Sequence, residues 1–233
     1  MMKKFFLKFS FIYFFYKVLK IFRNSKKNVH LAEFGEDIFV RRFFKKFTNG
    51  YYVDVGSYHP IKGSLTYDLY KKKWSGINID LSQISIDLFK LSRPKDINIR
   101  AAITDHNGKT FFYENSPINQ QNSLKENSSA KKIEINCYKL NTILDKNEIK
   151  KIDYLNIDAE GNDFKVISSF DFKKFNPMLV SIEFNDYNFD NFINSEINIL
   201  MEKNNYKLIS KFGVTCFYIK KENVKKIEEI MSI

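Results

Sequence analysis

The chain has 233 residues, of which 44% are hydrophobic and 28% charged, which excludes a wholly disordered or fibrous protein and suffices for a domain with a buried core. Its 38 Lys and Arg residues outnumber 27 Asp and Glu, and the resulting net charge of +11 is typical of chains that meet nucleic acid, an anionic membrane or an acidic substrate. The two cysteines, Cys137 and Cys216, lack metal-ligand spacing, so we expect neither a disulfide framework nor a structural zinc site, and we expect a cytoplasmic location.

The positive charge is concentrated in residues 1–32, which contain eight Lys or Arg residues among many aromatic ones and no acidic residue. Their longest uncharged stretch, 9–16, is too short to span a membrane, and no small-residue cleavage site follows it. We therefore expect an amphipathic helix within 1–32 that binds an anionic membrane surface, such as the inner face of the cytoplasmic membrane, through residues 1–28. The alternative is a helix packed on the domain or on a partner subunit, while no motif supports a nucleic-acid-binding arm.

Residues 33–233 are expected to form one domain in which β-like and helical stretches alternate. The residue pattern predicts strands at 51–55, 77–80, 98–104, 110–114, 132–138, 154–158, 178–184, 206–212 and 215–220. It predicts helices at 64–73 with Ser64 as N-cap, 82–92, 140–144, 163–170 and 190–204, and a polar loop at 115–130. This order predicts an α/β fold: a doubly wound, mostly parallel sheet with a C-terminal antiparallel hairpin, preceded by the N-terminal helix.

Two predicted strands end in residues suited to a nucleoside cofactor. The first ends in Asp54-Val55-Gly56, and the second ends at Asp80, 24 residues after the glycine. A glycine at such a strand end allows close approach of the backbone to a ligand, and the acid accepts hydrogen bonds from ribose hydroxyls. The turn lacks G-x-G-x-x-G and contains Pro60, which favours S-adenosylmethionine, a cofactor without phosphates, over a dinucleotide.

Three segments together resemble one protein family. Residues 52–60 read Tyr-Val-Asp-Val-Gly-Ser-Tyr-His-Pro, residues 74–80 contain Trp-x-Gly-x-Asn-Ile-Asp, and residues 157–163 read Ile-Asp-Ala-Glu-Gly-Asn-Asp. This combination resembles the FkbM family of methyltransferases over roughly residues 33–186, and Gly35-Glu36-Asp37 resembles the lead-in of that family.

The resemblance implies a class I methyltransferase fold, bound S-adenosylmethionine, and O-methylation of a glycan, a glycolipid precursor or a related small metabolite, as in polysaccharide biosynthesis. It also implies the residues that surround the cofactor. Glu36 belongs to the lead-in; Asp54, Gly56 and Ser57 would line the methionine half, Asp80 the ribose, Leu81 and Ser82 the nucleoside, and Ala101 and Ala102 the adenine.

The acceptor hydroxyl must lose a proton, so acidic residues near the predicted site are candidates for catalysis. Asp158 and Glu160 follow the strand at 154–158, and Asp158 is interpreted as a base, a metal ligand or a contact to the cofactor amino group. With Glu183 they offer a possible Mg²⁺ site, although no metal ligand is assigned. His59 is a further candidate base or a loop contact, and acceptor contacts are predicted at Asn122, Ser123 and Asn185.

Two other functions remain open from the sequence. One is a nicotinamide-dependent enzyme of sugar metabolism on a similar sheet, which the missing dinucleotide turn disfavours. The other is a non-catalytic binding module attached to a membrane by residues 1–32.

Overall fold

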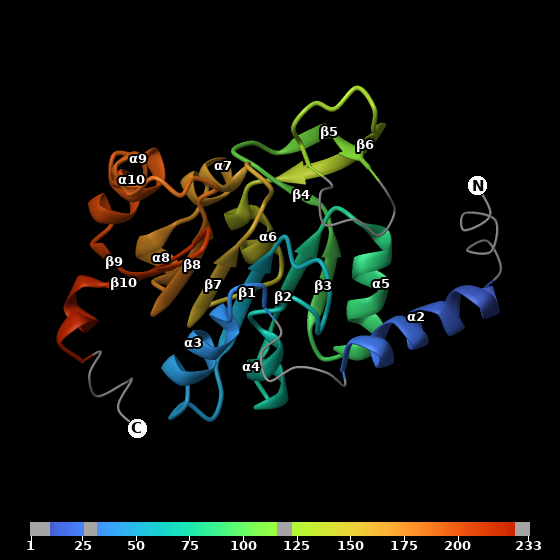
Figure 1. Cartoon of the computed structure of the whole chain (residues 1–233), viewed down its shortest axis with the longest axis horizontal. Coiled ribbons are helices and arrows are strands. Elements are labelled where there is room, and N and C mark those ends of the chain that lie inside the picture. The colour runs from blue at the N-terminus through green and yellow to red at the C-terminus, as the bar shows by residue number, and fades with distance from the viewer. Residues whose placement is uncertain (1–9, 26–31, 116–122, 227–233) are drawn as a thin grey trace.

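The computed structural model describes residues 10–25, 32–115 and 123–226, which fold around a seven-stranded sheet (Figure 1). Its strands are β1 (Tyr51–Val55), β2 (Ser75–Asp80), β3 (Ile97–Arg100), β7 (Tyr154–Ile157), β8 (Leu179–Glu183), β9 (Tyr206–Phe212) and β10 (Thr215–Lys220). Their order is β3-β2-β1-β7-β8-β10-β9, and β10 alone runs antiparallel to its neighbours β8 and β9. The predictions of a mixed α/β fold and of a C-terminal hairpin are therefore confirmed.

Helices connect and flank these strands (Figure 1). They are α2 (Ser10–Ser25), α3 (Glu36–Phe43), α4 (Tyr67–Lys71), α5 (Gln83–Ser92), α6 (Leu140–Lys146), α7 (Asp163–Ser168), α8 (Phe172–Phe175), α9 (Phe189–Ile193) and α10 (Glu196–Lys203), with a final 3₁₀ turn at Lys221–Lys226. The single helix expected over 190–204 is wrong, because the Ser195 side chain caps a new helix there by accepting a hydrogen bond from the Asn198 N–H. Among the described helices, none is both long and apolar enough to cross a membrane.

Strand side chains alternate between two buried faces of the sheet. Val53 and Leu155 point to one face and pack with apolar side chains of α6, α7 and α10. Tyr52 and Tyr154 point to the other face, where they join Trp74 and apolar side chains of α3 and α4. Because both faces are covered, the parallel strands are shielded from water, as such strands require.

A second, smaller sheet is built from β4 (Ala102–Ile103), β5 (Gly108–Glu114) and β6 (Lys131–Tyr138), in the order β4-β6-β5. The continuous strand expected over 98–104 is wrong, because β3 and β4 belong to different sheets. Ala101 lies between them, and its N–H donates to the Asp80 carbonyl at 3.2 Å. This connection brings the small sheet beside the end of β2. Cys137 in β6 and Cys216 in β10 are free, buried thiols.

The helix expected over 64–73 starts late, at Tyr67, because the hydroxyl groups before it are engaged elsewhere. Ser64 Oγ and Thr66 Oγ1 accept hydrogen bonds from the Arg93 guanidinium at 2.7 and 2.8 Å. Thr66 Oγ1 in turn donates to Asp54 at 2.7 Å. Ser64 is therefore not the N-cap of α4; it joins the β1–α4 connection to the sheet.

Candidate active site

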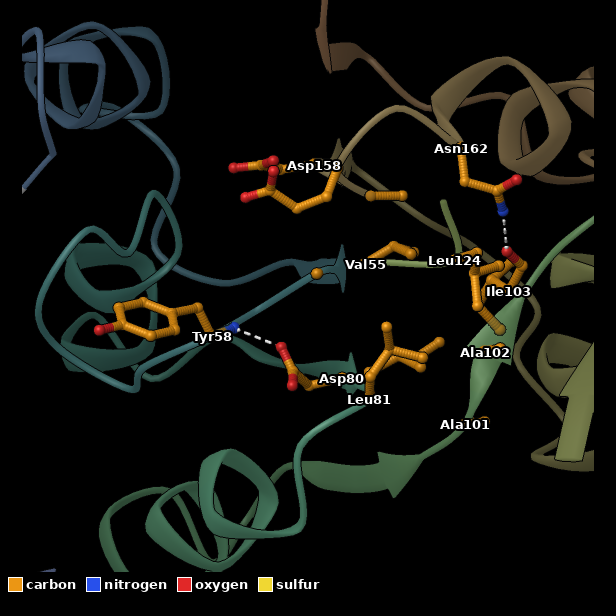
Figure 2. A pocket seen from close by; sticks show the side chains of 14 residues that line it. Val55, Tyr58, Asp80, Leu81, Ala101, Ala102, Ile103, Leu124, Asp158 and Asn162 are labelled. Atoms are coloured by element: carbon orange, nitrogen blue, oxygen red, sulfur yellow. Dashed lines mark hydrogen bonds between the residues drawn. The ribbon is translucent and has the colours of Figure 1, made fainter. Parts of the chain in front are cut away.

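A cavity lies at the carboxyl ends of β1, β2 and β7, the edge of the sheet where parallel α/β folds bind ligands. Figure 2 shows Asp158 and Asp80 on opposite sides of this cavity, with apolar side chains gathered at one end. A second cavity shares Gly56, Tyr58, Asp158 and Glu160 with the first, so the two form one cleft. All the predicted cofactor residues except Ser82 line one cavity or the other: Glu36, Asp54, Gly56, Ser57, Asp80, Leu81, Ala101 and Ala102.

Gly56 allows two strand ends to approach each other closely. Its N–H and that of Ser57 donate to the Ile79 carbonyl at 2.9 and 3.1 Å, which binds the end of β1 to β2. Its φ of +79° lies in the left-handed region, and a Cβ at this position would stand 1.6 Å from the Asp158 carbonyl oxygen. The glycine is therefore required by both the conformation and the contact with the end of β7.

We expect Gly56→Ala to destabilise the protein more than Gly63→Ala, which serves as a matched control. Gly63 has a similar φ of +73° but open space around its absent Cβ, so its substitution measures backbone strain alone, about 1–2 kcal/mol. The collision with Asp158 should add a further loss of about 1–3 kcal/mol at Gly56. Urea unfolding of the three proteins gives both differences, and equal losses for the two variants would contradict the steric argument.

Asp80 is held in place by backbone groups. Its Oδ2 accepts from the Tyr58 N–H at 2.9 Å and its Oδ1 from the Ser82 N–H at 2.7 Å. Burial raises the pKa of its carboxyl to about 6, although both hydrogen bonds oppose this shift. Ser82 is not among the residues that line the cavity; its Oγ caps α5 by accepting from the Ser85 N–H at 3.3 Å.

The apolar end of the first cavity forms a slot beside Asp80. Leu81, Ala101 and Ala102 line it, and Leu124 from the loop after β5 also contributes. Asn162 closes the slot, and its Nδ2 donates to the Ile103 carbonyl at 2.7 Å (Figure 2). Leu124 and Asn162 were not predicted as site residues, since they come from a polar loop and from a helix start far along the chain.

The second cavity contains Asp54, predicted to lie at the methionine half of the cofactor, and Glu36 of the lead-in. Asp54 is 2% exposed, and Asn156 Nδ2 donates to its Oδ1 at 2.8 Å. Burial raises the pKa of Asp54, while the hydrogen bonds and Arg93 lower it. Glu36 accepts from the Phe34 N–H at 2.9 Å and from Thr215 Oγ1 at 3.3 Å, which places it across the cleft beside β10.

Four acidic side chains gather where β7 and β8 end. Asp158 is accessible through the cleft, yet the surrounding protein and the charges of Glu183, Asp163 and Glu160 raise its pKa well above the ordinary value. Burial and the charges of Asp163 and Glu160 raise the pKa of Glu183 to about 7, opposed by its hydrogen bond with Asp158 and by Lys125. The Asp158–Glu183 pair therefore holds a proton near neutral pH.

The other two acids of this group have different surroundings. Asp163 is buried and accepts from the backbone N–H groups of Ala159 and Gly161 at 2.7 and 2.9 Å, so it shapes the turn after β7. Glu160 lines the cleft with a φ of +50°, and burial raises the pKa of its carboxyl, while Lys125 lowers it. The candidate proton acceptors of the cleft are thus Asp158, Glu183 and Glu160.

The structure does not bring His59 to the lining of either cavity. Its side chain is 1% exposed, and Nδ1 accepts from the N–H groups of Ile61 and Lys62, both at 3.0 Å. Burial lowers the pKa of His59 to about 3, so the imidazole stays neutral. Of its two interpretations, this geometry fits the loop contact.

Two of the three residues predicted to contact the methyl acceptor, Ser123 and Asn185, lie beside the cleft. Ser123 Oγ donates to the Glu160 carbonyl at 3.0 Å, and Asn185 lines the second cavity. Both also line a third, polar cavity that continues outward past Glu160. Asn122 lies outside the described residues.

No group of three or more His, Cys, Asp or Glu side chains in the described parts of the chain is arranged to hold a metal ion. The acids around Asp158 instead lie in contact with one another and with backbone donors. The Mg²⁺ alternative therefore gains no support from the geometry.

Comparison with known proteins identifies the family. Residues 54–208, more than half of the chain, match the family model described as the methyltransferase FkbM domain. No curated protein and no solved structure matches the chain significantly. The matched region contains Asp54, Gly56, Asp80 and the acids at the ends of β7 and β8. The match favours a methyltransferase rather than a nicotinamide-dependent enzyme or a non-catalytic binding module. The chain belongs to the FkbM family of methyltransferases.

Proposed function

We propose that this methyltransferase uses S-adenosylmethionine to O-methylate a hydroxyl of a glycan, a glycolipid precursor or a related small metabolite. The catalytic domain occupies residues 33–233 as a doubly wound class I methyltransferase fold. The observation that carries this proposal is the order of groups along one cleft: an apolar slot, then the backbone-held carboxylate of Asp80, then the Asp158–Glu183 pair.

The cleft residues fit this cofactor. The slot at Leu81, Ala101 and Ala102 suits a flat adenine ring, because two small side chains leave room on one side. Each Asp80 oxygen accepts one backbone N–H and keeps a lone pair for a ribose hydroxyl. Asp54 and Glu36 supply negative charge at the far end. When bound, S-adenosylmethionine supplies a methyl group on a positively charged sulfur.

The chain's own contribution to the reaction is to orient the acceptor and to take its proton. An alcohol keeps its proton at neutral pH, so a positioned base is needed as the new bond forms. The Asp158–Glu183 pair, with one proton shared and a pKa near neutrality at Glu183, leaves one carboxylate able to accept another proton. Asp158 faces the cleft and is the residue that meets the hydroxyl.

The third cavity supports a hydroxyl-rich acceptor. It is lined by hydroxyl, amide and charged groups: Tyr113, Asn115, Ser123, Lys125, Glu126, Asn127, Ser128, Glu160, Gly161 and Asn185. Such groups form directional hydrogen bonds with sugars, whereas an apolar metabolite would leave them unpaired. Exposed Tyr187 and Phe34 at the adjoining second cavity add aromatic surface for the apolar face of a sugar ring.

We expect Asp80→Asn to weaken S-adenosylmethionine binding by about 10- to 100-fold, because the amide offers one acceptor oxygen in place of two and carries no charge. Since the Asp80 pKa is raised to about 6, the affinity of the wild-type chain should also fall as the pH drops below that value and the carboxyl gains a proton. Isothermal titration calorimetry at several pH values measures both effects.

Asp145→Asn is the control for this substitution. Asp145 is exposed and pairs with Lys174 on the surface, so its loss should leave cofactor affinity unchanged. Undiminished binding by Asp80→Asn would remove Asp80 from the ribose site. Absence of binding by the wild-type chain would contradict the choice of S-adenosylmethionine.

The acceptor class is tested by methyl transfer from labelled S-adenosylmethionine to nucleotide sugars, polysaccharide fragments and glycolipid precursors. We expect transfer to a member of this panel, with the label retained on oxygen after alkaline treatment of the product. Running each reaction with and without EDTA determines whether a divalent cation is required. Transfer only to amines or thiols would overturn the O-methyltransferase proposal.

A further inference from the structure

The helix α2 lies against α5 through its polar side. Tyr13 Oη donates to Asp87 Oδ2 at 2.6 Å, and Gln83 Nε2 donates to the other oxygen of the same carboxylate at 3.0 Å. Lys17 Nζ stands 4.7 Å from the centre of the Tyr13 ring. Figure 1 shows the helix beside α5 and extending away from the rest of the molecule. Its half-buried positions include the polar residues Tyr13, Tyr16, Lys17 and Lys20.

Four large apolar side chains of α2 are instead exposed, while Val18 and Ile21 are half-buried. Ile12 is 40% exposed and Leu19, two turns later, 58%; Phe14 and Phe15 are 48% and 56% exposed. A helix that packs on its own domain buries its apolar side and exposes its charged one. The arrangement in α2 is the reverse, so the alternative of a helix stabilised by burial on this domain does not account for it.

The charge of the segment indicates what covers this surface. Residues 1–32 carry eight cations and no acid, whereas the remaining residues carry a net charge of +3. Apolar side chains interleaved with cations suit the boundary between anionic headgroups and acyl chains. We propose that the exposed side of α2, formed by Ile12, Phe14, Phe15 and Leu19, is a docking surface for an anionic lipid bilayer.

Because α2 lies near the β1–α4 connection, docking through α2 also determines where the cleft lies relative to the membrane. Tyr16 lies near enough to Tyr58, and Lys20 near enough to His59, for a charge on one residue to shift the pKa of the other. Tyr58 lines both main cavities. Docking through α2 therefore holds the β1–α4 connection, and the cleft beside it, next to the membrane. The proposed docking itself does not depend on the proposed methyl acceptor.

The test is co-sedimentation of the full chain with vesicles of phosphatidylcholine alone or of an equal mixture with phosphatidylglycerol. We expect binding to the anionic vesicles, weakened when salt rises from about 0.1 to 1 M because the charges are then screened. The double variant Ile12→Ser/Leu19→Ser should bind roughly tenfold or more weakly, since two side chains leave the apolar contact.

The matched control is Ile193→Ser/Ile199→Ser, which removes side chains that are 47% and 58% exposed on α9 and α10. It should bind vesicles as the wild-type chain does. Circular dichroism and cofactor affinity, measured for both double variants, report whether the fold is kept. Absence of wild-type binding to anionic vesicles, or equal weakening by both double variants, would overturn the proposal. Concentration-dependent self-association in sedimentation velocity, abolished by Ile12→Ser/Leu19→Ser without any vesicle binding, would assign the surface to a second copy instead.

Discussion

Asp158→Asn is expected to lower the rate constant of methyl transfer by about 10²- to 10⁴-fold, the range for loss of a positioned base. Asparagine keeps the size of the side chain but cannot accept the hydroxyl proton. The affinity for S-adenosylmethionine should change by no more than about tenfold, because Asp158 is one of many groups that line the cofactor cavity. The measurement is single-turnover methyl transfer to the acceptor with the highest rate in the panel, together with calorimetry of the cofactor.

The pH profile separates a base from a merely structural acid. With the Glu183 pKa raised to about 7, the wild-type rate should increase as the pH rises through that region, because the pair then loses one of its two protons and gains a carboxylate able to act as the base. Glu183→Gln removes the partner, so this rise should disappear. Stability should not fall in Asp158→Asn, because the substitution removes one acid from a group of four that repel one another when ionised.

The control is Glu134→Gln, which removes an exposed carboxylate paired with Lys109 on the small sheet and should leave the rate unchanged. A rate for Asp158→Asn within about threefold of the wild-type value would exclude Asp158 as the base. If Glu160→Gln then produced the large loss, the proton would be assigned to Glu160.

The strand-end residues were predictable from sequence because a parallel sheet gathers its carboxyl ends at one edge. Asp54 is the penultimate residue of a short strand, Asp80 ends one, and Gly56 and Asp158 each follow one, so finding the strands also places these residues near one another. The face of the sheet to which each side chain points is also predictable from sequence, since it alternates between successive residues of one strand.

The missed residues depend on contacts between distant parts of the chain. Leu124 reaches the slot from a polar loop, and Asn162 bonds to a carbonyl 59 residues earlier, which no local pattern encodes. The role of His59 was ambiguous for a related reason. A histidine after a strand has the same sequence signature whether its ring faces a substrate or accepts two backbone N–H groups.

Arg93 is the most consequential residue that the sequence did not indicate. It stands next to Pro94 at the end of α5, where an arginine is ordinarily exposed, yet it is 0% exposed. Its guanidinium donates to the Pro60 carbonyl and to the hydroxyls of Ser64 and Thr66, and it packs against the rings of Phe89, Tyr67 and Tyr70. Arg93 therefore holds in place the β1–α4 connection, and this connection forms one wall of the cleft.

Arg93→Met is expected to lower the free energy of unfolding by about 3–5 kcal/mol at neutral pH, the range for removing one partner of a buried charge network. Methionine fills similar space but leaves the Pro60 carbonyl unpaired. It also removes the positive charge that lowers the pKa of buried Asp54 and Asp96. Urea denaturation measures this loss, and Arg42→Met, at an exposed position of α3, is the control with an expected change within about 0.5 kcal/mol.

The pH dependence of this loss identifies its electrostatic part. Burial already raises the pKa values of Asp54 and Asp96 above 3.8, and without Arg93 they rise further. A carboxyl whose pKa is higher in the folded than in the unfolded state binds its proton more tightly in the folded protein. It does not destabilise the fold at a pH below its unfolded-state pKa, where it is protonated in both states. Its destabilising effect grows as the pH rises from there through its folded-state pKa. The difference between wild type and Arg93→Met should therefore be smaller near pH 4 than near pH 7. Adding Asp96→Asn, which removes one of the two uncompensated charges, should recover part of the loss at pH 7 and little at pH 4. A pH-independent difference would attribute the role of Arg93 to packing and hydrogen bonding alone.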